Sequence, residues 1–267
     1  MMAKRSIEPV IGDAPDNASE LDDESVTSDR LLGGRLHLRQ PAAGYRVAID
    51  PVFLAAAVPA TPRNRILDAG AGTGAALLCL AARVPECRIA GLEQDKEIAQ
   101  LARENVAENG FSDRIEIVVG DITAPPPELW AGSYDHVMMN PPYLESTRAR
   151  PPADVKRAAA MLEGAVELHD WIRFAHAMLR DRGTLTLIHR ADRIDQLMAA
   201  FRSGFGAVAV LPLWPAARRP AKRVVLRARK GAASPAALLP GLVLHGEDGK
   251  FTPAAEAILR EGRALDF

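Results

Sequence analysis

The segment Ile66-Leu67-Asp68-Ala69-Gly70-Ala71-Gly72-Thr73-Gly74 indicates the fold class of this chain. Its apolar start is typical of a buried strand, and its three glycines predict a tight turn. The Ala-rich apolar run 75–82 that follows predicts a helix. Strand, glycine turn and helix in this order form the first unit of an α/β fold.

The same alternation of strand and helix continues along the chain. We expect further strands at 88–93, 115–119, 135–139, 184–188, 207–213 and 224–229. Such repeats predict a mainly parallel, twisted sheet with helices on both faces. Ahead of this core we expect an edge strand at 35–40 and a helix with Asp50 as N-cap and Pro51 at its first position.

The first 30 residues differ from the rest in composition. They carry three basic and eight acidic residues and few large apolar side chains. This composition predicts disorder. We therefore expect residues 1–30 to be a disordered acidic tail. Residues 31–267 should form a single domain that begins with the short strand and helix described above.

Polar residues follow the expected strands at the points where these end. They are Asp68, Glu93, Asp121 and Asn140. In doubly wound sheets ligands bind beyond the carboxyl ends of the strands, which share one edge. The sequence therefore predicts a ligand site at this edge.

The segment Asn140-Pro141-Pro142-Tyr143 favours chemistry on a planar NH2 group, such as an adenine amine or a carboxamide. Neither proline has a backbone N–H, and a residue before proline is held extended, so the two prolines offer carbonyl acceptors and no N–H donor. The Asn140 side-chain oxygen and the Pro141 carbonyl can hold two N–H groups and expose the nitrogen lone pair. Tyr143 can stack on a base. The alternative is an ordinary strand followed by an Asn-Pro turn.

The glycine turn predicts S-adenosylmethionine as the cofactor. Gly70, Gly72 and Ala75 also fit the loose dinucleotide pattern G-x-G-x-x-A, but the Asp68 carboxylate would repel a pyrophosphate and attract an ammonium or sulfonium. Glu93 suits ribose hydroxyls. The expected cofactor-binding residues are Asp50, Asp68, Gly70, Ala71, Gly72, Glu93, Asp121 and Asn140. The alternative is that the glycines only form a tight turn between strand and helix and bind no cofactor.

Bulk properties exclude several classes of protein. The two cysteines, Cys79 and Cys87, have no metal-ligand spacing, so we expect neither a metal site nor a disulfide scaffold, and a cytoplasmic location. No apolar run approaches the length of about 18 residues that a membrane helix needs.

Basic residues concentrate near the carboxyl-terminal end of the chain. Between Asp195 and Glu247 there is no acidic residue. The basic residues there are Arg202, Arg218, Arg219, Lys222, Arg223, Arg227, Arg229 and Lys230. Such a stretch attracts a phosphate backbone, although a solvated strand face would look similar. We expect RNA contacts from Arg218, Arg219, Lys222 and Arg223, and also from Arg148 and Arg150.

With these residues in hand, the chain resembles the class I S-adenosylmethionine-dependent methyltransferases, which have a Rossmann-like fold. Within them it is similar to the family that methylates N6 of the adenine just 3′ of the anticodon, tRNA position 37, in a bacterial valine tRNA. The narrower similarity lies in 44–51, 212–215 and 221–224. The resemblance implies cofactor binding by the glycine-turn residues and catalysis by Asn140, Pro141, Pro142 and Tyr143.

Other substrates fit the same motifs. A protein glutamine N5-methyltransferase acting on release factors would use the same tetrapeptide on a carboxamide. Those enzymes carry a helical substrate domain before the core, and the segment that precedes the core here is too short for one. A ribosomal RNA base methyltransferase is a further alternative, and so is a non-catalytic module that binds S-adenosylmethionine and RNA.

Overall fold

The computed structural model describes residues 26–43, 49–142, 167–202 and 204–267. Its N-terminal half contains β1 Val26–Leu31, η2 Leu32–Gly34, β2 Leu36–Pro41, α1 Asp50–Ala57, β3 Arg65–Ala69, α2 Ala75–Arg83, β4 Arg88–Glu93, α3 Lys96–Glu108, β5 Ile115–Val119 and β6 Tyr134–Met139. The remainder contains α5 Leu168–Met178, β7 Leu179–Arg190, η3 Ala191–Arg193, α6 Ile194–Phe201, β8 Phe205–Ala216, β9 Arg223–Lys230, β10 Ala237–Leu238, β11 Leu242–His245 and α7 Pro253–Leu259.

The large sheet has the strand order β10-β8-β9-β7-β6-β3-β4-β5, and β11 also pairs with β8. All pairs from β7 to β5 are parallel, whereas β9 runs antiparallel to both β7 and β8. The expectation of a mainly parallel sheet is confirmed. Because β9 is reversed, the connection between β8 and β9 lies at the same edge as the carboxyl ends of the parallel strands.

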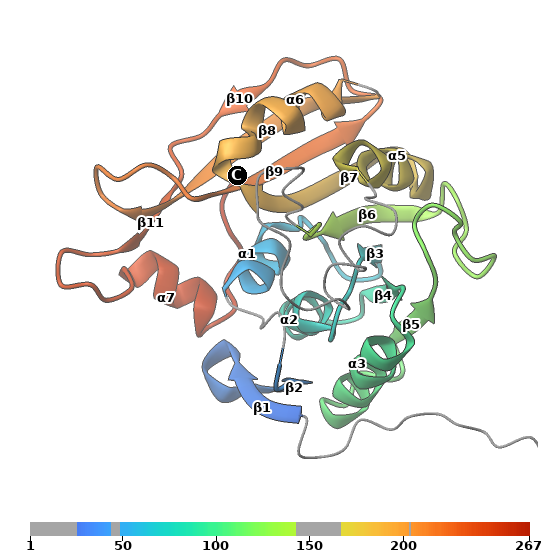
Figure 1. The fold of residues 1–267 in the computed structure, drawn as a ribbon. Helices are drawn as coiled ribbons and strands as arrows, with labels where there is room; N and C mark the ends of the chain where they lie inside the picture. Colours follow the sequence, from blue (N-terminus) through green and yellow to red (C-terminus); the bar gives the residue numbers. More distant parts are fainter. Residues whose placement is uncertain (1–25, 44–48, 143–166, 203) are drawn as a thin grey trace, which may run out of the picture.

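Helices cover both faces of this sheet, as predicted (Figure 1). One layer of the core packs α1, α2, α3 and α7 against one face. The other layer packs α5 and α6 against the opposite face. Neighbouring residues of a strand alternate between the two layers, as Met138 and Met139 do. Leu67 packs in the layer of α5 and α6, and its neighbour Asp68 is the register partner of Met138, which packs in the other layer. The Asp68 side chain therefore faces the layer that contains α1 and α2.

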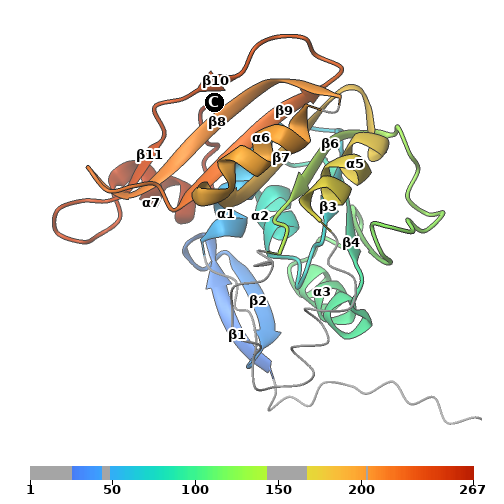
Figure 2. The same cartoon turned by 45° about the horizontal axis from the view of Figure 1, so that its top comes forward.

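The N-terminal segment forms a hairpin instead of the single edge strand that we expected. β1 pairs antiparallel with β2, so residues 26–30, which we expected in the disordered tail, form a strand. The rest of that expected tail, residues 1–25, lies outside the described residues. The hairpin lies apart from the large sheet and next to α3 (Figure 2). The buried Asn105 of α3 fastens it. Its Oδ1 accepts from the Arg39 N–H at 2.8 Å, and its Nδ2 donates to the carbonyls of Arg39 at 3.0 Å and Thr73 at 2.9 Å.

The helix α1 also differs from its prediction at the first turn. Asp50 is the first helical residue and Ile49 is the N-cap, so Asp50 does not cap the helix. The reason is that its carboxylate is bound elsewhere, by an arginine described below. In the part of the chain that the structure covers, no helix is both long and apolar enough to cross a membrane.

Candidate functional site

The glycine turn connects β3 to α2 as predicted. Gly70, Gly72 and Gly74 have φ values of 72°, 55° and 90°, a region that favours glycine. The N–H groups of Gly70 and Ala71 both donate to the Leu92 carbonyl at 2.9 Å. The turn is therefore fixed to the neighbouring strand β4, and its conformation depends on these glycines.

Trp171 of α5 packs against the turn, a contact that sequence reasoning missed. A Cβ added at Gly70 would lie 2.8 Å from the Trp171 ring, so only glycine fits there. A Cβ at Gly72 would meet nothing within 4 Å. One side of the turn is thus closed by an indole, and the backbone at Gly72 has open space beside it.

Asp68 is a buried carboxylate next to this turn. Its Oδ2 has no hydrogen-bond partner among the described residues. Burial, and then the charge of Glu93, raise its pKa from 3.8 to about 7, against a smaller opposing effect of a backbone hydrogen bond from Leu77. An unpartnered buried carboxylate costs free energy, which a bound cation would recover.

The next two strand ends also carry carboxylates. Glu93 accepts from the Gly72 N–H through Oε2 at 2.9 Å and from the Asp95 N–H through Oε1 at 3.0 Å. Asp121 accepts from the N–H and the hydroxyl of Thr123 through Oδ1, at 2.7 Å and 2.9 Å. Both side chains are half-buried and oriented by short hydrogen bonds. Asp68 and Glu93 thus lie at the carboxyl ends of β3 and β4, and Asp121 follows β5, so the three residues come from neighbouring strands.

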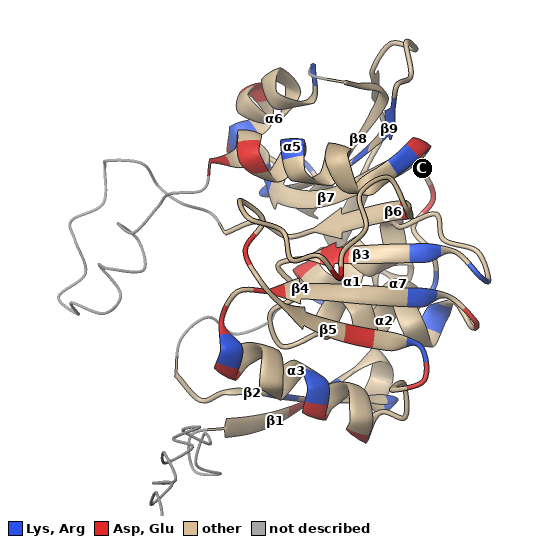
Figure 3. Ribbon diagram, turned by 90° about the vertical axis from the view of Figure 1, so that its right-hand side faces the viewer, with Lys and Arg blue, Asp and Glu red and all other residues tan. Residues whose placement is uncertain are grey.

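Charge is distributed unevenly across the sheet. Figure 3 shows acidic residues at the carboxyl ends of β3 and β4 and basic residues at their amino ends, where Arg65 and Arg88 begin the two strands. A cofactor with an ammonium, a sulfonium and ribose hydroxyls matches the acidic edge, since carboxylates attract the cations and accept from the hydroxyls. A pyrophosphate would be repelled. The residues present therefore fit S-adenosylmethionine.

Asn140 follows β6 directly and lies at the same edge. β6 pairs with β3 in parallel, with Asp68 opposite Met138 and Ala69 opposite Met139. The residue after Met139 therefore lies beside the start of the glycine turn. Asn140 is half-buried, Pro141 is buried and Pro142 is exposed. Tyr143 lies outside the described residues, and its stacking role stays a prediction.

Asp50 binds an arginine from the other end of the chain. Its Oδ2 accepts from Nε of Arg223 at 2.8 Å. The expected contact of Asp50 with the cofactor stays a prediction. We expected Arg223 to contact RNA. It is half-buried and paired with Asp50, so it is not an exposed cation.

The exposed residues of the basic stretch form two groups, one at the carboxyl ends and one at the amino ends of the parallel strands. Arg218, Arg219 and Lys222 are exposed in the connection between β8 and β9, at the edge of the glycine turn. Arg202 and Arg229, also exposed, lie near the start of β8 and the end of β9, at the opposite edge.

Two cations of the stretch have structural contacts instead. Lys230 donates to the carbonyls of His176 and Leu179, and Arg227 lies over the Phe267 ring. The basic residues of this stretch therefore do not form one continuous surface. Arg148 and Arg150 lie outside the described residues.

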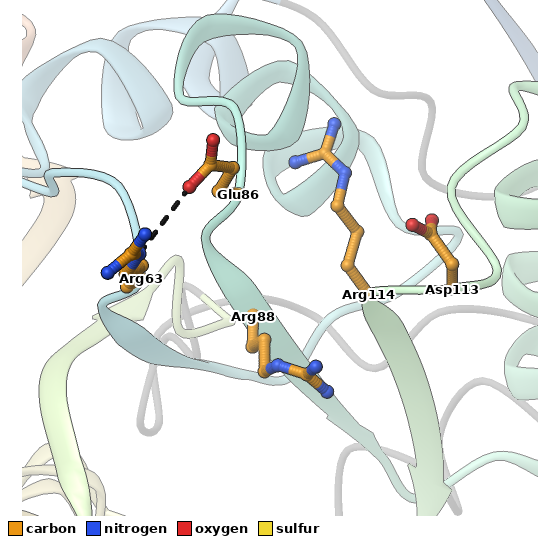
Figure 4. A pocket seen from close by; sticks show the side chains of 5 residues that line it. All are labelled: Arg63, Glu86, Arg88, Asp113 and Arg114. Atoms are coloured by element: carbon orange, nitrogen blue, oxygen red, sulfur yellow. Dashed lines mark ion pairs between the residues drawn. The ribbon is translucent and has the colours of Figure 1, made fainter.

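A hollow of about 500 Å³ lies away from this site, at the amino ends of the strands. Figure 4 shows its lining residues, which are Arg63, Glu86, Arg88, Asp113 and Arg114. Arg63 and Glu86 form an ion pair at 3.6 Å. The hollow contains neither the glycine turn nor Asn140, so we assign the candidate site to the carboxyl edge.

Residues 46–213, more than half of the chain, match the Methyltransferase small domain family. A Porphyromonas gingivalis protein named tRNA1(Val) (adenine(37)-N6)-methyltransferase is 37% identical over 169 residues, which cover 61% of this chain and 66% of the relative. The alignment thus spans just under two thirds of that relative. An Aeromonas hydrophila protein of the same name is 28% identical over 82% of this chain and 90% of its own.

A crystal structure from Agrobacterium tumefaciens, of a protein described as a predicted O-methyltransferase, has a TM-score of 0.69 and 30% identity. It covers 81% of this chain and 98% of that one. The fold class and the resemblance to methyltransferases are confirmed. The chain belongs to the Methyltransferase small domain family.

Proposed function

We propose that this protein transfers the methyl group of S-adenosylmethionine to N6 of an adenine in tRNA. The names of the Porphyromonas and Aeromonas relatives favour position 37 of a valine tRNA as the target. The match to the Methyltransferase small domain family, over residues 46–213, covers both the glycine turn and Asn140. A tRNA substrate also favours a cytoplasmic location.

The observation that carries this proposal is the position of Asn140 next to the glycine turn. The parallel register of β3 and β6 brings the two motifs to one edge on neighbouring strands. Strands of a sheet are about 4.8 Å apart, so a group held at Asn140 would lie within contact distance of a ligand at the turn.

The residues at Asn140 suit an amine whose lone pair is delocalised into a ring. The Asn140 side-chain oxygen and the Pro141 carbonyl can each accept one N–H of the adenine amine. Holding both N–H groups turns the nitrogen lone pair toward the methyl group. No general base is required before transfer, because the amine is neutral and becomes acidic only once it is methylated.

The cofactor, when bound, supplies a methyl group on a sulfonium, which is a good leaving group. Asp68 and the backbone of the glycine turn would hold its cationic part. Glu93 would accept from the ribose hydroxyls, and Asp121 would accept from the adenine amino group. Trp171 closes one side of the turn and helps to exclude water from it.

The exposed cations of the β8–β9 connection support a nucleic acid substrate. Arg218, Arg219 and Lys222 lie at the edge where Asn140 lies. Phosphate contacts there would hold an RNA loop next to the catalytic segment. The acidic carboxyl ends of β3 to β5 remain for the cofactor, so the two ligands would meet complementary charges at one edge.

The test is methyl transfer from labelled S-adenosylmethionine to three separate substrates: unmodified valine tRNA, ribosomal RNA and a release factor. Nucleoside analysis should find N6-methyladenosine in the tRNA, at position 37. If the label appeared instead on a release-factor glutamine or in ribosomal RNA, that molecule would be the substrate and the proposed tRNA substrate would be wrong. Binding of the cofactor without transfer to any of the three would contradict an enzymatic role on these substrates.

A further inference from the structure

Arg223 connects the basic β8–β9 connection to the helix α1. Its Nε donates to Oδ2 of Asp50 at 2.8 Å, and its Nη1 donates to the Lys222 carbonyl at 3.2 Å. The same Lys222 carbonyl accepts from the Ala191 N–H at 3.1 Å. One guanidinium thus contacts both a carboxylate 173 residues earlier in the chain and the backbone of the basic connection.

This ion pair is well suited to hold its two elements in a fixed relation. The side chain of Asp50 is 7% exposed and that of Arg223 is 33% exposed. A buried carboxylate is stable only with a partner, and the start of a helix adds a favourable interaction with negative charge. The planar guanidinium can donate in several directions at once, which an ammonium cannot do with the same geometry.

The pair connects two elements, α1 and β9, that contact the elements of the expected ligand sites. α1 packs against α2, which follows the glycine turn, and also against β7 and β9. In the sheet, β9 is two strands away from β6, which ends before Asn140. Two strand spacings are about 10 Å. The basic connection and the catalytic segment are therefore close enough to bind neighbouring parts of one RNA loop.

We propose that Arg223 is a positioning residue for the RNA substrate. Through Asp50 it holds the connection 217–222 at a fixed place relative to Asn140, and it does not itself bind a phosphate. Asp50 anchors Arg223 and does not bind the cofactor. This inference rests on the proposed function, and it changes two of the roles that the sequence predicted.

The test compares Arg223→Gln, Asp50→Asn and the double variant with the wild-type protein. kcat and KM for tRNA are measured at saturating S-adenosylmethionine, together with cofactor affinity, the salt dependence of RNA binding and thermal unfolding. We expect each single variant to lower kcat about ten- to hundredfold, the range for a displaced reactant. The double variant should lower it no further, because each change already breaks the Arg223–Asp50 ion pair, the contact that we propose to act on kcat.

Two readouts separate positioning from direct contact. Cofactor affinity and the slope of RNA affinity against salt should stay at the wild-type values in both single variants. A slope reduced by about one in Arg223→Gln alone would show a phosphate contact and overturn the inference. Weaker cofactor binding in Asp50→Asn alone would show a cofactor contact and would also overturn it, as would additive losses in the double variant.

Arg223→Lys provides the test if Arg223→Gln fails to fold. Lysine keeps the charge but cannot reproduce both hydrogen bonds, so we expect a reduced kcat with an unchanged salt slope. Wild-type kcat in Arg223→Lys would overturn the inference. Failure of the proposed function is seen separately, because the wild-type protein would then not methylate tRNA, and the inference would fall with it.

Discussion

Glu93 and Gly72 are joined by a hydrogen bond of 2.9 Å from the Gly72 N–H to Oε2 of the carboxylate. This bond connects the end of β4 to the turn that follows β3. It fixes the carboxylate rotamer before any ligand arrives, so binding would cost less side-chain entropy. The residue expected to bind ribose hydroxyls is therefore preorganised by the turn expected to bind the rest of the cofactor.

Glu93→Ala should weaken S-adenosylmethionine binding by about ten- to hundredfold. The substitution removes hydrogen bonds to a charged acceptor, which contribute about 1.5–3 kcal/mol each. Titration calorimetry measures the change. Glu128→Ala, an exposed glutamate in the loop before β6, is the matched control and should bind the cofactor normally. Equal affinity in both variants would contradict the ribose role.

Asp68→Asn should stabilise the cofactor-free protein at pH 8. In the unfolded chain this carboxyl loses its proton near pH 3.8, whereas in the folded protein burial and Glu93 raise its pKa to about 7. Folding therefore takes up a proton between these values, and the free energy of unfolding falls as pH rises, by about 1.4 kcal/mol for each unit of pKa difference. Asparagine does not titrate and avoids this loss.

Thermal melts of both proteins at pH 4, 6 and 8 measure this effect. The difference in the free energy of unfolding between variant and wild type should grow from pH 4 to pH 7 and stay constant above pH 7. Other titrating groups, such as His136, cancel in that difference. A difference that does not depend on pH would refute the assignment. The same variant should bind S-adenosylmethionine more weakly, and wild-type affinity should fall as pH drops below 7.

Asn140→Ala should reduce methyl transfer by about 10²–10³-fold, the usual effect of removing one preorganised hydrogen-bonding group from an active site. Cofactor affinity should stay near that of the wild-type protein, since the turn and the three carboxylates remain. Single-turnover transfer and calorimetry test both parts. A parallel loss of transfer and of cofactor binding would argue that Asn140 mainly supports the cofactor site.

Arg218→Glu/Arg219→Glu should weaken tRNA binding and flatten its dependence on salt. Each lost phosphate contact lowers the slope of log affinity against log salt by about one. Arg202→Glu/Arg229→Glu is the control, with the same charge change at the opposite edge of the sheet. The two double variants are compared by filter binding at several salt concentrations. Equal slopes in both would mean that the β8–β9 connection does not bind RNA.

Asn105→Ala should destabilise the fold by roughly 2–4 kcal/mol. It removes three hydrogen bonds from a fully buried side chain, and each buried group left without a partner costs about 1–3 kcal/mol. Denaturant unfolding measures the loss. Asn109→Ala, one helical turn later and half-exposed, also contacts the hairpin and should cost less. A larger loss of unfolding free energy in Asn109→Ala than in Asn105→Ala would contradict the importance of burial.

Two strands of the parallel part of the sheet could be predicted from the sequence because each is a short, mostly apolar run. Arg88–Glu93 and Ile115–Val119 have the bounds expected from their apolar runs. The hairpin strand Val26–Leu31 was missed because Thr27, Ser28, Asp29 and Arg30 give it no apolar pattern. It is held by pairing with β2, and local sequence does not reveal such a contact.

The candidate site was predictable as far as it depends on strand ends. Asp68 and Glu93 lie at the carboxyl ends of parallel strands and Asn140 directly follows one, so topology alone brings them to one edge. The Arg223–Asp50 pair was not predictable, because it joins residues 173 positions apart through an antiparallel strand. Trp171 gave no signal either, since an indole on an amphipathic helix is usually explained by core packing.

The reversed strand β9 separates the proposed RNA-binding segment from the proposed methyl-donor site. Leu213 and Arg223 are register partners in the sheet, and the connection between them leaves and re-enters it at one place. Insertions, deletions or exchanges within 217–222 would change the surface that we propose to contact RNA, while β3, β4 and β5 keep their pairing. On the proposed function, natural divergence or deliberate grafting of this segment would therefore change the RNA target without rebuilding the methyl-donor site.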